Sequence, residues 1–513
     1  MCLVSNIGRQ AVVQQNILII GAGIAGLNTA LALASPGRTL TLIERDPPPP
    51  EASAEAAFDV WERRGVGHLR HSHAFLARLY LLLRDKYPDL LGELLEAGCR
   101  ELKFEDGVPA TLREEYQAIP EDNDLTILTS RRTTLEFVMR RYVSKLPSVQ
   151  IVPNARVKGL LHERTEDGTL NVTGATIERD GQAEDIKANL VVDAGGKNAL
   201  GFDWLKAEGV QIRTEVENAG ILYFTRHYRL KDGQEEPPKG KLPAGADLGY
   251  VKYGLFPADN RCFSITLAVP DIEMELRSKI VRPEVFDAIC RALPALEPWI
   301  EETRVDPTSR VFGMGELKSQ WRHMVEDGKP VVLNYYPLGD NLIRSNPLYG
   351  RGCSFAAVAA HALAEALETK QGSVAQALHY YKTVTREIRP YYDSMRKLDQ
   401  AAIKRAAREL DPTYTPGIKA KVLKSFINDA ITIAMRSDIG LLREAMHGFH
   451  MLSHPDAWLK KPRNFFKVMW IWARGKKRNQ AYYTPRLGPK RHEMFALLNL
   501  SPTVDWERHK EAA

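Results

Sequence analysis

The feature that most restricts the fold lies near the start of the chain, where an apolar run meets three closely spaced glycines. Residues 16–20 have the length and composition of a buried strand, and the turn Gly-Ala-Gly-Ile-Ala-Gly at 21–26 follows directly. Residues 27–34, rich in alanine and leucine, predict a helix, and residues 39–43 predict a second strand that ends at Glu44. This complete strand, turn, helix and strand unit is typical of dinucleotide-binding domains.

Each glycine of this turn has a physical reason in such a unit. Gly21 permits the tight turn, Gly23 lets the backbone approach a pyrophosphate at the helix N-terminus, and Gly26 lets helix and strand pack closely. Glu44 follows at a spacing that suits hydrogen bonds from a ribose. The alternative to dinucleotide binding is that residues 21–26 form only a tight turn inside an α/β core. We predict cofactor contacts from Gly21, Gly23, Ile24, Ala25, Gly26, Glu44 and Arg45.

Composition excludes several other classes of protein. The chain has 513 residues, is 44% apolar and 26% charged, and is long enough for two or three globular domains. A net charge of +6 is mild for this length and predicts no nucleic-acid partner. The five cysteines are scattered and predict neither a metal site nor a disulfide framework. We expect a cytoplasmic protein without a targeting or membrane-spanning segment.

In two later segments of the sequence, an apolar run is followed by an acidic residue and glycine. Residues 188–196 form a short apolar strand that ends in Asp193, Ala194 and two glycines. Residues 331–336 predict another strand, which leads into a loop that contains Gly339 and Asp340 and runs into an alanine-rich helix. Ligands of parallel α/β sheets bind outside the carboxyl ends of the strands, so these loops predict one shared site.

Together these motifs resemble those of the flavoprotein monooxygenases of the p-hydroxybenzoate hydroxylase fold, over about residues 14–370. The turn at 21–26 looks like their ADP-binding turn, and residues 193–195 look like their second fingerprint. Gly339-Asp340, followed by residues 346–352, looks like their flavin-holding loop. With the His-rich stretch 61–73, this loop looks most like bacterial epoxidases and hydroxylases that act on hydrophobic polyketide or polyene substrates of secondary metabolism.

The resemblance implies FAD as the cofactor. Asp340 would accept hydrogen bonds from the ribityl chain, and the glycines at 350 and 352 would let backbone amides approach the flavin ring. A helix from Ser354 onward would present its N-terminus to the reduced flavin. The resemblance also implies cofactor contacts from Arg132, Asp193, Gly195, Gly339, Pro347, Gly350, Arg351 and Gly352.

The source of electrons stays open. The family pattern differs from this chain at Asn198 and Asn341, which weakens the part of the second fingerprint associated with NAD(P)H. The reductant is therefore either NAD(P)H or a reduced flavin system with a separate flavin reductase.

The implied fold is α/β, with a Rossmann-like FAD-binding domain, an inserted antiparallel β-sheet substrate domain and a helical C-terminal region. The aromatic and β-branched residues of segments 219–230, 250–257 and 262–269 independently predict antiparallel strands. The predicted division is 14–200 with 331–370 for FAD, with part of the substrate domain inserted near 80–130, then 201–330 for the substrate sheet and 371–513 for the helices.

The implied reaction is epoxidation or hydroxylation of a small hydrophobic substrate by molecular oxygen, through a flavin C4a-hydroperoxide. His71 and His73 are candidate proton donors, because histidine titrates near neutral pH; the alternative is that they only pack or lie on the surface. A halogenase would be expected to carry a Trp-x-Trp-x-Ile-Pro motif, whereas Trp470-Ile-Trp472 continues as Ala-Arg. An FAD-dependent dehydrogenase, an isoprenoid reductase or cyclase, and a flavin-binding scaffold remain alternatives.

Residues 458–478 mix aromatic with basic residues. The favoured interpretation is a helix that packs its Phe and Trp face over the substrate opening while its lysines stay in water. The alternative is a surface helix that contacts a membrane or a carrier protein.

Overall fold

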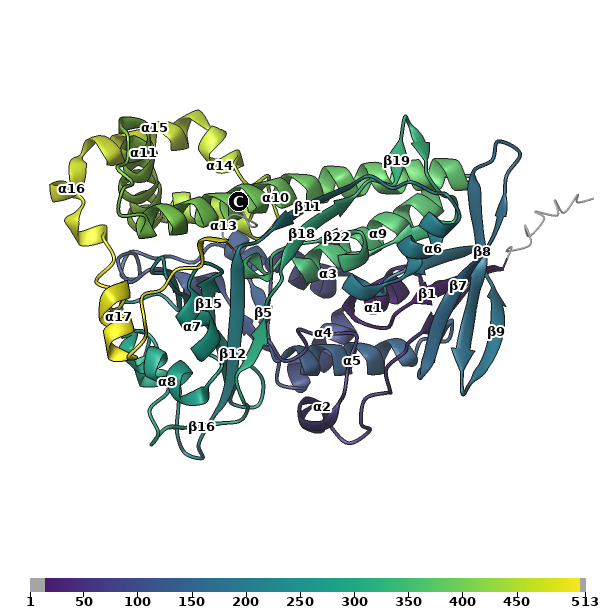
Figure 1. Cartoon of the computed structure of the whole chain (residues 1–513), viewed down its shortest axis with the longest axis horizontal. Coiled ribbons are helices and arrows are strands. Elements are labelled where there is room, and N and C mark those ends of the chain that lie inside the picture. Colours follow the sequence, from purple (N-terminus) through teal and green to yellow (C-terminus); the bar gives the residue numbers. More distant parts are fainter. Residues whose placement is uncertain (1–13, 508–513) are drawn as a thin grey trace, which may run out of the picture.

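The computed structural model describes residues 14–507 and contains a five-stranded parallel sheet, whose strand β1 (Gln15–Ile20) is labelled in the right half of Figure 1. Its strands, in spatial order, are β21 (Tyr335–Pro337), β10 (Leu190–Asp193), β1 (Gln15–Ile20), β2 (Arg38–Ile43) and β6 (Val149–Val152). Both faces of the sheet are covered, so its strands are continuous apolar runs. The predicted α/β fold is confirmed by this sheet.

Strand β21 is shorter than the run 331–336 predicted. Only Tyr335–Pro337 pair with β10, although the apolar residues begin at Val331. Asn334 has a φ of 55°, a left-handed backbone conformation that cannot continue a strand. The chain therefore bends at Asn334, and β21 begins only at the next residue.

Helices and a second sheet flank the parallel sheet. Helix α1 (Ile24–Leu33) packs against α9 (Gly352–Thr369), and α9 packs against the long helix α10 (Ser373–Leu410). Helix α5 (Arg132–Ser144) also contacts α1. An antiparallel sheet of β7 (Ala155–Arg164), β8 (Leu170–Arg179) and β9 (Gln182–Lys187) lies at the right-hand end of the molecule in Figure 1.

The predicted antiparallel strands form the largest sheet of the second half. Its members are β13 (Gly245–Asp247), β14 (Lys252–Pro257), β15 (Cys262–Pro270), β12 (Ile221–Leu230), β16 (Val305–Pro307) and β17 (Phe312–Met314). Helices α7 (Met274–Lys279) and α8 (Pro283–Ala292) follow β15 in the chain, and α8 packs on the sheet. A smaller sheet consists of β11 (Thr214–Asn218), β18 (Lys318–Arg322) and β22 (Ile343–Arg344). It connects this half to the loop at 339–352, which the sequence resemblance identifies as the flavin-holding loop and which we call the flavin loop.

Shorter elements complete these two halves. Between β2 and β6 lie α2 (Ala54–Val60), β3 (Ala74–Phe75), α3 (Ala77–Lys86), α4 (Pro88–Glu96), β4 (Arg100–Leu102) and β5 (Ile127–Thr129). Strands β3, β5 and β4 form a small antiparallel sheet. Apart from short 3-10 turns, the other elements of these halves are α6 (Gly201–Ala207) and the hairpin of β19 (Val325–Glu326) and β20 (Lys329–Pro330).

The C-terminal region is helical and has a core of its own. Beyond α10 come α11 (Ile418–Ser425), the π-helical turn η7 (Phe426–Ile431), α12 (Thr432–Ser437), α13 (Ile439–Phe449), α14 (Ala457–Lys460), α15 (Pro462–Ala473), α16 (Gly475–Arg478) and α17 (Arg491–Leu497). Helices α11, α15 and α16 lie at one corner of the molecule and α13 lies closer to its middle, while α17 returns to the antiparallel sheet (Figure 1). Within residues 14–507, every helix is too short or too polar to cross a bilayer.

Candidate functional site

A cavity of about 1240 Å³ lies where the carboxyl ends of β1, β2 and β10 meet the antiparallel sheet. It brings together residues that are more than 300 positions apart in the sequence. Both candidate histidines and most of the predicted cofactor residues line it: His71, His73, Gly21, Gly23, Ile24, Ala25, Glu44, Arg45, Arg132, Asp193, Gly195, Gly339, Asp340, Pro347, Gly350 and Gly352.

Two predicted cofactor residues do not line this cavity. Gly26 faces the turn itself, since a Cβ there would lie 1.9 Å from the carbonyl oxygen of Gly21. Arg351 is buried between α10 and the end of α13, where its guanidinium donates to the carbonyl of Tyr391 and lies over the ring of Phe449. Both residues support the loops that line the cavity instead of forming its wall.

The turn between β1 and α1 has the form that a diphosphate requires. Gly21 has a φ of 91°, and a Cβ at this position would lie 2.7 Å from the carbonyl oxygen of Ala194. The N-terminus of α1 has no side-chain cap and no acidic residue in its first turn, so its N–H groups are available to an anion. The cavity wall carries ten Lys or Arg residues and five Asp or Glu residues, which suits an anionic ligand.

Glu44 is held in place by a buried arginine that the sequence patterns did not identify. Its Oε2 accepts hydrogen bonds from the Ala22 N–H at 3.0 Å and from Arg63 at 2.7 Å, and its Oε1 accepts from the Asp46 N–H at 3.0 Å. Arg63 also pairs with Asp46 and Glu136. Because a carboxylate offers about four acceptor positions, Glu44 keeps one for a ribose hydroxyl.

Asp340 is the most informative acid in the cavity. None of the hydrogen bonds between described residues involves its carboxylate, although the group is enclosed. Burial raises the pKa of Asp340, against the opposing effect of the nearby Arg132, Arg344 and Lys197. An enclosed carboxylate among cations, with its acceptor positions open, suits the hydroxyl groups of a ribityl chain.

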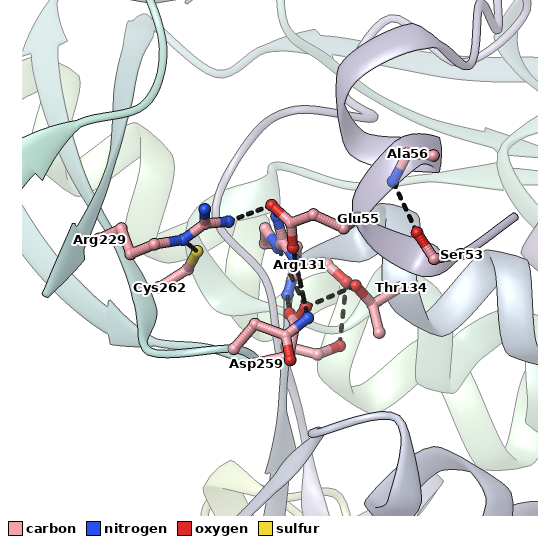
Figure 2. Close-up of polar contacts among 10 residues, drawn as sticks. Ser53, Glu55, Ala56, Arg131, Thr134, Arg229, Asp259 and Cys262 are labelled. Atoms are coloured by element: carbon pink, nitrogen blue, oxygen red, sulfur yellow. Dashed lines mark hydrogen bonds and ion pairs between the residues drawn. The ribbon is translucent and has the colours of Figure 1, made fainter. Parts of the chain in front are cut away.

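The two adjacent arginines at the start of α5 have different roles. Arg131 points away from the cavity into an ion-pair cluster with Glu55 and Asp259, and Arg229 from β12 also pairs with Glu55 (Figure 2). Arg132 points to the cavity, where it pairs with Glu136. Of these two neighbouring arginines, only Arg132, the one that the resemblance implied, lines the cavity.

His71 begins a chain of hydroxyl groups on the antiparallel sheet. Its Nδ1 lies 3.0 Å from the Thr225 hydroxyl, which lies 2.7 Å from the Thr266 hydroxyl, and Thr266 donates to Ser72 at 2.8 Å. His73 Nε2 lies 3.4 Å from the guanidinium of Arg132.

Both histidines are uncharged at neutral pH. Burial lowers the pKa of His71 to about 4 and, together with Arg132, that of His73 to about 3. The premise that these side chains titrate near neutral pH is wrong, because each is enclosed at the wall of the cavity. A neutral imidazole can still accept one hydrogen bond and donate another.

Part of the cavity wall is formed by residues that no sequence motif indicated, and most of them are apolar. They come from β12, β14, β15 and β17, from the loop after β17 and from the end of α13: Tyr223, Tyr253, Phe256, Ala268, Met314, Leu317, Phe449 and His450. The predicted strands were the only available signal for the residues of β12, β14 and β15, and Met314 and Leu317 lie outside them. For Phe449 and His450 no signal existed, because the C-terminal region reaches the cavity only in the folded chain.

The second helix after the loop at 339–352, α10, also supports that loop from behind. Asp399 of α10 accepts hydrogen bonds from the Asn346 amide at 2.8 Å and from the Tyr349 hydroxyl at 3.0 Å. Tyr223 donates to Asn346 at 2.5 Å, so a strand, the loop and α10 are joined at one buried point. Burial raises the pKa of Asp399 to about 6, against the effect of these hydrogen bonds.

Comparisons with known proteins agree with this geometry. A protein-family model described as DAO, FAD dependent oxidoreductase, matches residues 16–366. Protein Rv3254 of Mycobacterium tuberculosis is 27% identical over 398 residues, which are 72% of this chain and 76% of that protein.

Two solved structures share the fold at low sequence identity. A triple mutant of the flavin-dependent brominase Bmp2 has a TM-score of 0.56 and 16% identity, covering 90% of this chain and 100% of its own. OxyS anhydrotetracycline hydroxylase from Streptomyces rimosus has a TM-score of 0.53 and 14% identity, covering 85% of this chain and 76% of its own.

Proposed function

Because this chain belongs to the FAD dependent oxidoreductase family, we propose that it holds FAD in the cavity and inserts one oxygen atom of O2 into a hydrophobic organic substrate by epoxidation or hydroxylation. One observation carries this proposal. The cavity that contains the glycine turn and Asp340 is also lined by Tyr223, Phe256 and Met314 from the antiparallel sheet. A flavin oxygenase requires a dry space beside its cofactor, because water would destroy the activated oxygen.

The residues of the cavity fit FAD part by part. Gly21 and Gly23 would approach the diphosphate, Glu44 would accept from the adenosine ribose, and Asp340 would accept from the ribityl chain. The loop at 350–352 would lie along the flavin ring. When bound, FAD supplies the activation of oxygen, and the protein supplies position, dryness and proton transfer.

The hydroxyl chain from His71 offers a path for a proton. Thr225 accepts from or donates to both His71 and Thr266, and all three line the cavity. Hydroxyl groups can pass a proton by rotating, and a neutral imidazole can take and return one at its two nitrogens. We propose that His71 is the proton relay and that His73 orients Arg132.

Replacing Thr225 by valine removes this hydroxyl and keeps the shape of the side chain. We expect the proton-dependent phase in the reaction of the reduced protein with oxygen to slow by about tenfold or more, with FAD still bound. The rate of this phase is measured in H2O and in D2O. Between pH 6 and 8 we expect no titration of His71 in this rate, because the pKa of His71 is about 4. Thr176→Val, in the β8 hairpin outside the cavity, is the control. An unchanged rate in Thr225→Val contradicts the relay.

The proposal is tested by reducing the FAD-loaded protein without oxygen and then mixing it with air-saturated buffer. An oxygenase is expected to show an absorbance that rises and decays before the oxidised spectrum returns. Return of the oxidised spectrum in one phase favours a dehydrogenase, reductase or cyclase. Reduction with NADH alone, with NADPH alone, and with NAD(P)H in the presence of free FAD and a flavin reductase identifies the electron source.

Halogenation has less support than oxygen insertion. Trp470 and Trp472, the only Trp-x-Trp pair of the sequence, lie in α15 and do not line the cavity. The likeness to a brominase extends to the fold alone. Bromide added during the reaction of the reduced protein with oxygen is expected to leave the rates unchanged.

A further inference from the structure

Helix α15 is apolar on two opposite faces, and only one of them is covered. Val468 and Ile471 are buried in the core of the C-terminal region. On the opposite face, Phe466 is 70% exposed and Trp470 is 62% exposed. These two residues are four positions apart and so lie side by side on the helix. The favoured interpretation of this segment, with its Phe and Trp face packed over the substrate opening, is therefore wrong for Phe466 and Trp470.

A second helix with exposed apolar side chains, α11, lies close to α15. Helix α11 has no buried residue, and its Ile418 is 83% exposed and its Leu423 57% exposed. The turn η7 contacts both helices, and the rings of Phe426 and Trp472 lie 5.4 Å apart between them. Figure 1 shows α11 and α15 together at the outer corner of the molecule, far from the parallel sheet. We call the exposed side chains Ile418, Val422, Leu423, Ile427, Phe465, Phe466 and Trp470 the apolar corner.

Basic residues surround the apolar corner. Residues 418–478 contain thirteen Lys or Arg and four Asp or Glu, a net charge of +9, whereas the whole chain carries +6. Arg474 lies over the ring of Trp470 at 4.9 Å. Arg463 and Lys477 are exposed on α15 and α16. The positive charge of the protein is thus concentrated around its most exposed aromatic residues.

We propose that the apolar corner docks onto an anionic lipid bilayer, with Phe466 and Trp470 inserted at the level of the headgroups. Interfacial helices combine Trp, Phe or Leu on one face with Lys and Arg beside it, and α15 has this combination. Tryptophan prefers the boundary between hydrocarbon and headgroups, where its ring is apolar and its N–H stays hydrated. The surrounding lysines and arginines are attracted to anionic lipids. This inference does not depend on the proposed oxygenation.

Sedimentation of the full-length, FAD-loaded protein with vesicles tests this proposal. We expect binding to vesicles of phosphatidylcholine with phosphatidylglycerol, weaker binding to phosphatidylcholine alone, and release as the salt concentration rises. Tryptophan fluorescence is expected to shift to shorter wavelength on binding, and Trp470→Phe is expected to bind with most of this shift lost. Protein that stays in the supernatant with both kinds of vesicle overturns the proposal and leaves an acidic protein as the partner to test.

Matched variants separate the apolar from the charged contribution. Phe466→Ser/Trp470→Ser is expected to lower the affinity for the anionic vesicles by about tenfold or more. Val60→Ser/Leu497→Ser, which alters equally exposed apolar residues elsewhere, is expected to leave it unchanged.

A second pair of variants tests the contribution of the positive charges in the same way. Arg463→Gln/Lys477→Gln is expected to weaken binding by about tenfold. Lys187→Gln/Lys206→Gln removes the same charge from exposed positions outside this region and is expected to have little effect. Equal binding of wild type and Phe466→Ser/Trp470→Ser, or equal loss in each variant and its control, overturns the proposal.

Discussion

Replacing Asp340 by alanine is expected to yield a protein that folds but loses most of its FAD during purification. Asp340 is enclosed in the cavity beside Arg132, Arg344 and Lys197, and none of the hydrogen bonds between described residues reaches its carboxylate. Its acceptor positions are therefore open to the cofactor. A hydrogen bond to a charged group contributes about 1.5–3 kcal/mol, so we expect FAD to bind about 10 to 100 times more weakly. Titration of the apoprotein with FAD measures this change.

Two further variants define the role of this carboxylate. Asp340→Asn keeps one acceptor oxygen and is expected to retain more FAD than Asp340→Ala. Asp306→Ala removes a surface carboxylate from β16, which lies outside the cavity, and is expected to bind FAD like the wild type. If Asp340→Ala binds FAD as tightly as the wild type, the flavin loop does not lie where we place it.

Replacing Arg131 by methionine is expected to destabilise the whole protein strongly. The guanidinium of Arg131 joins Glu55, at the start of α2, to Asp259, in the turn before β15 (Figure 2). The side chains of Arg131 and Asp259 are 1% and 0% exposed, so the change leaves Asp259 buried without its cation. Breaking a buried ion pair on one side costs about 3–5 kcal/mol. The thermal unfolding temperature, followed by circular dichroism, is expected to fall accordingly.

The controls for this cluster distinguish a buried pair from an exposed one. Arg131→Met/Asp259→Leu removes both charges and is expected to recover part of the lost stability. Arg179→Met breaks the exposed pair with Asp180 and is expected to change the stability by less than about 1 kcal/mol. A loss for Arg131→Met no larger than that for Arg179→Met would contradict the role of the cluster.

The same cluster sets a pH dependence. Burial alone would raise the pKa of Glu55, but hydrogen bonds and charge from Arg131 and Arg229 outweigh it and lower the pKa to about 2. Because this value lies below the unfolded value of about 4.3, the ion pairs stabilise the fold fully above that pH. Their contribution is lost as the pH falls from about 4 to about 2. In Arg131→Met, the stability that is lost between about pH 4 and about pH 2 is expected to be smaller than in the wild type.

The first strand, turn and helix could be predicted because their signals are local. The apolar run, the spacing of the glycines and the acid after the second strand all lie within residues 16–44. The flavin loop at 339–352 carries its own turn residues in the same way. The predicted antiparallel strands at 219–230, 250–257 and 262–269 correspond to β12, β14 and β15 within a few residues.

The remaining features depend on contacts between distant parts of the chain. Arg131 and Arg132 are neighbours in sequence, and only the position of Asp259 shows which of them faces away from the cavity. Thr225 becomes part of the site because a strand passes beside His71. The exposure of Trp470 depends on whether another helix covers α15, which the composition of α15 alone does not determine.

Asp399 also determines how much of the chain the oxidoreductase core requires. The family match ends at residue 366, within α9, whereas the acid that anchors Asn346 and Tyr349 lies in the next helix. A polypeptide cut at the end of the match would keep every glycine that we propose to approach the cofactor, and it would lose the side chain that holds the loop at 346–349. Shortened versions of this enzyme should therefore end after residue 410, and transplanting its nucleotide-binding half into another protein requires α10 to move with it.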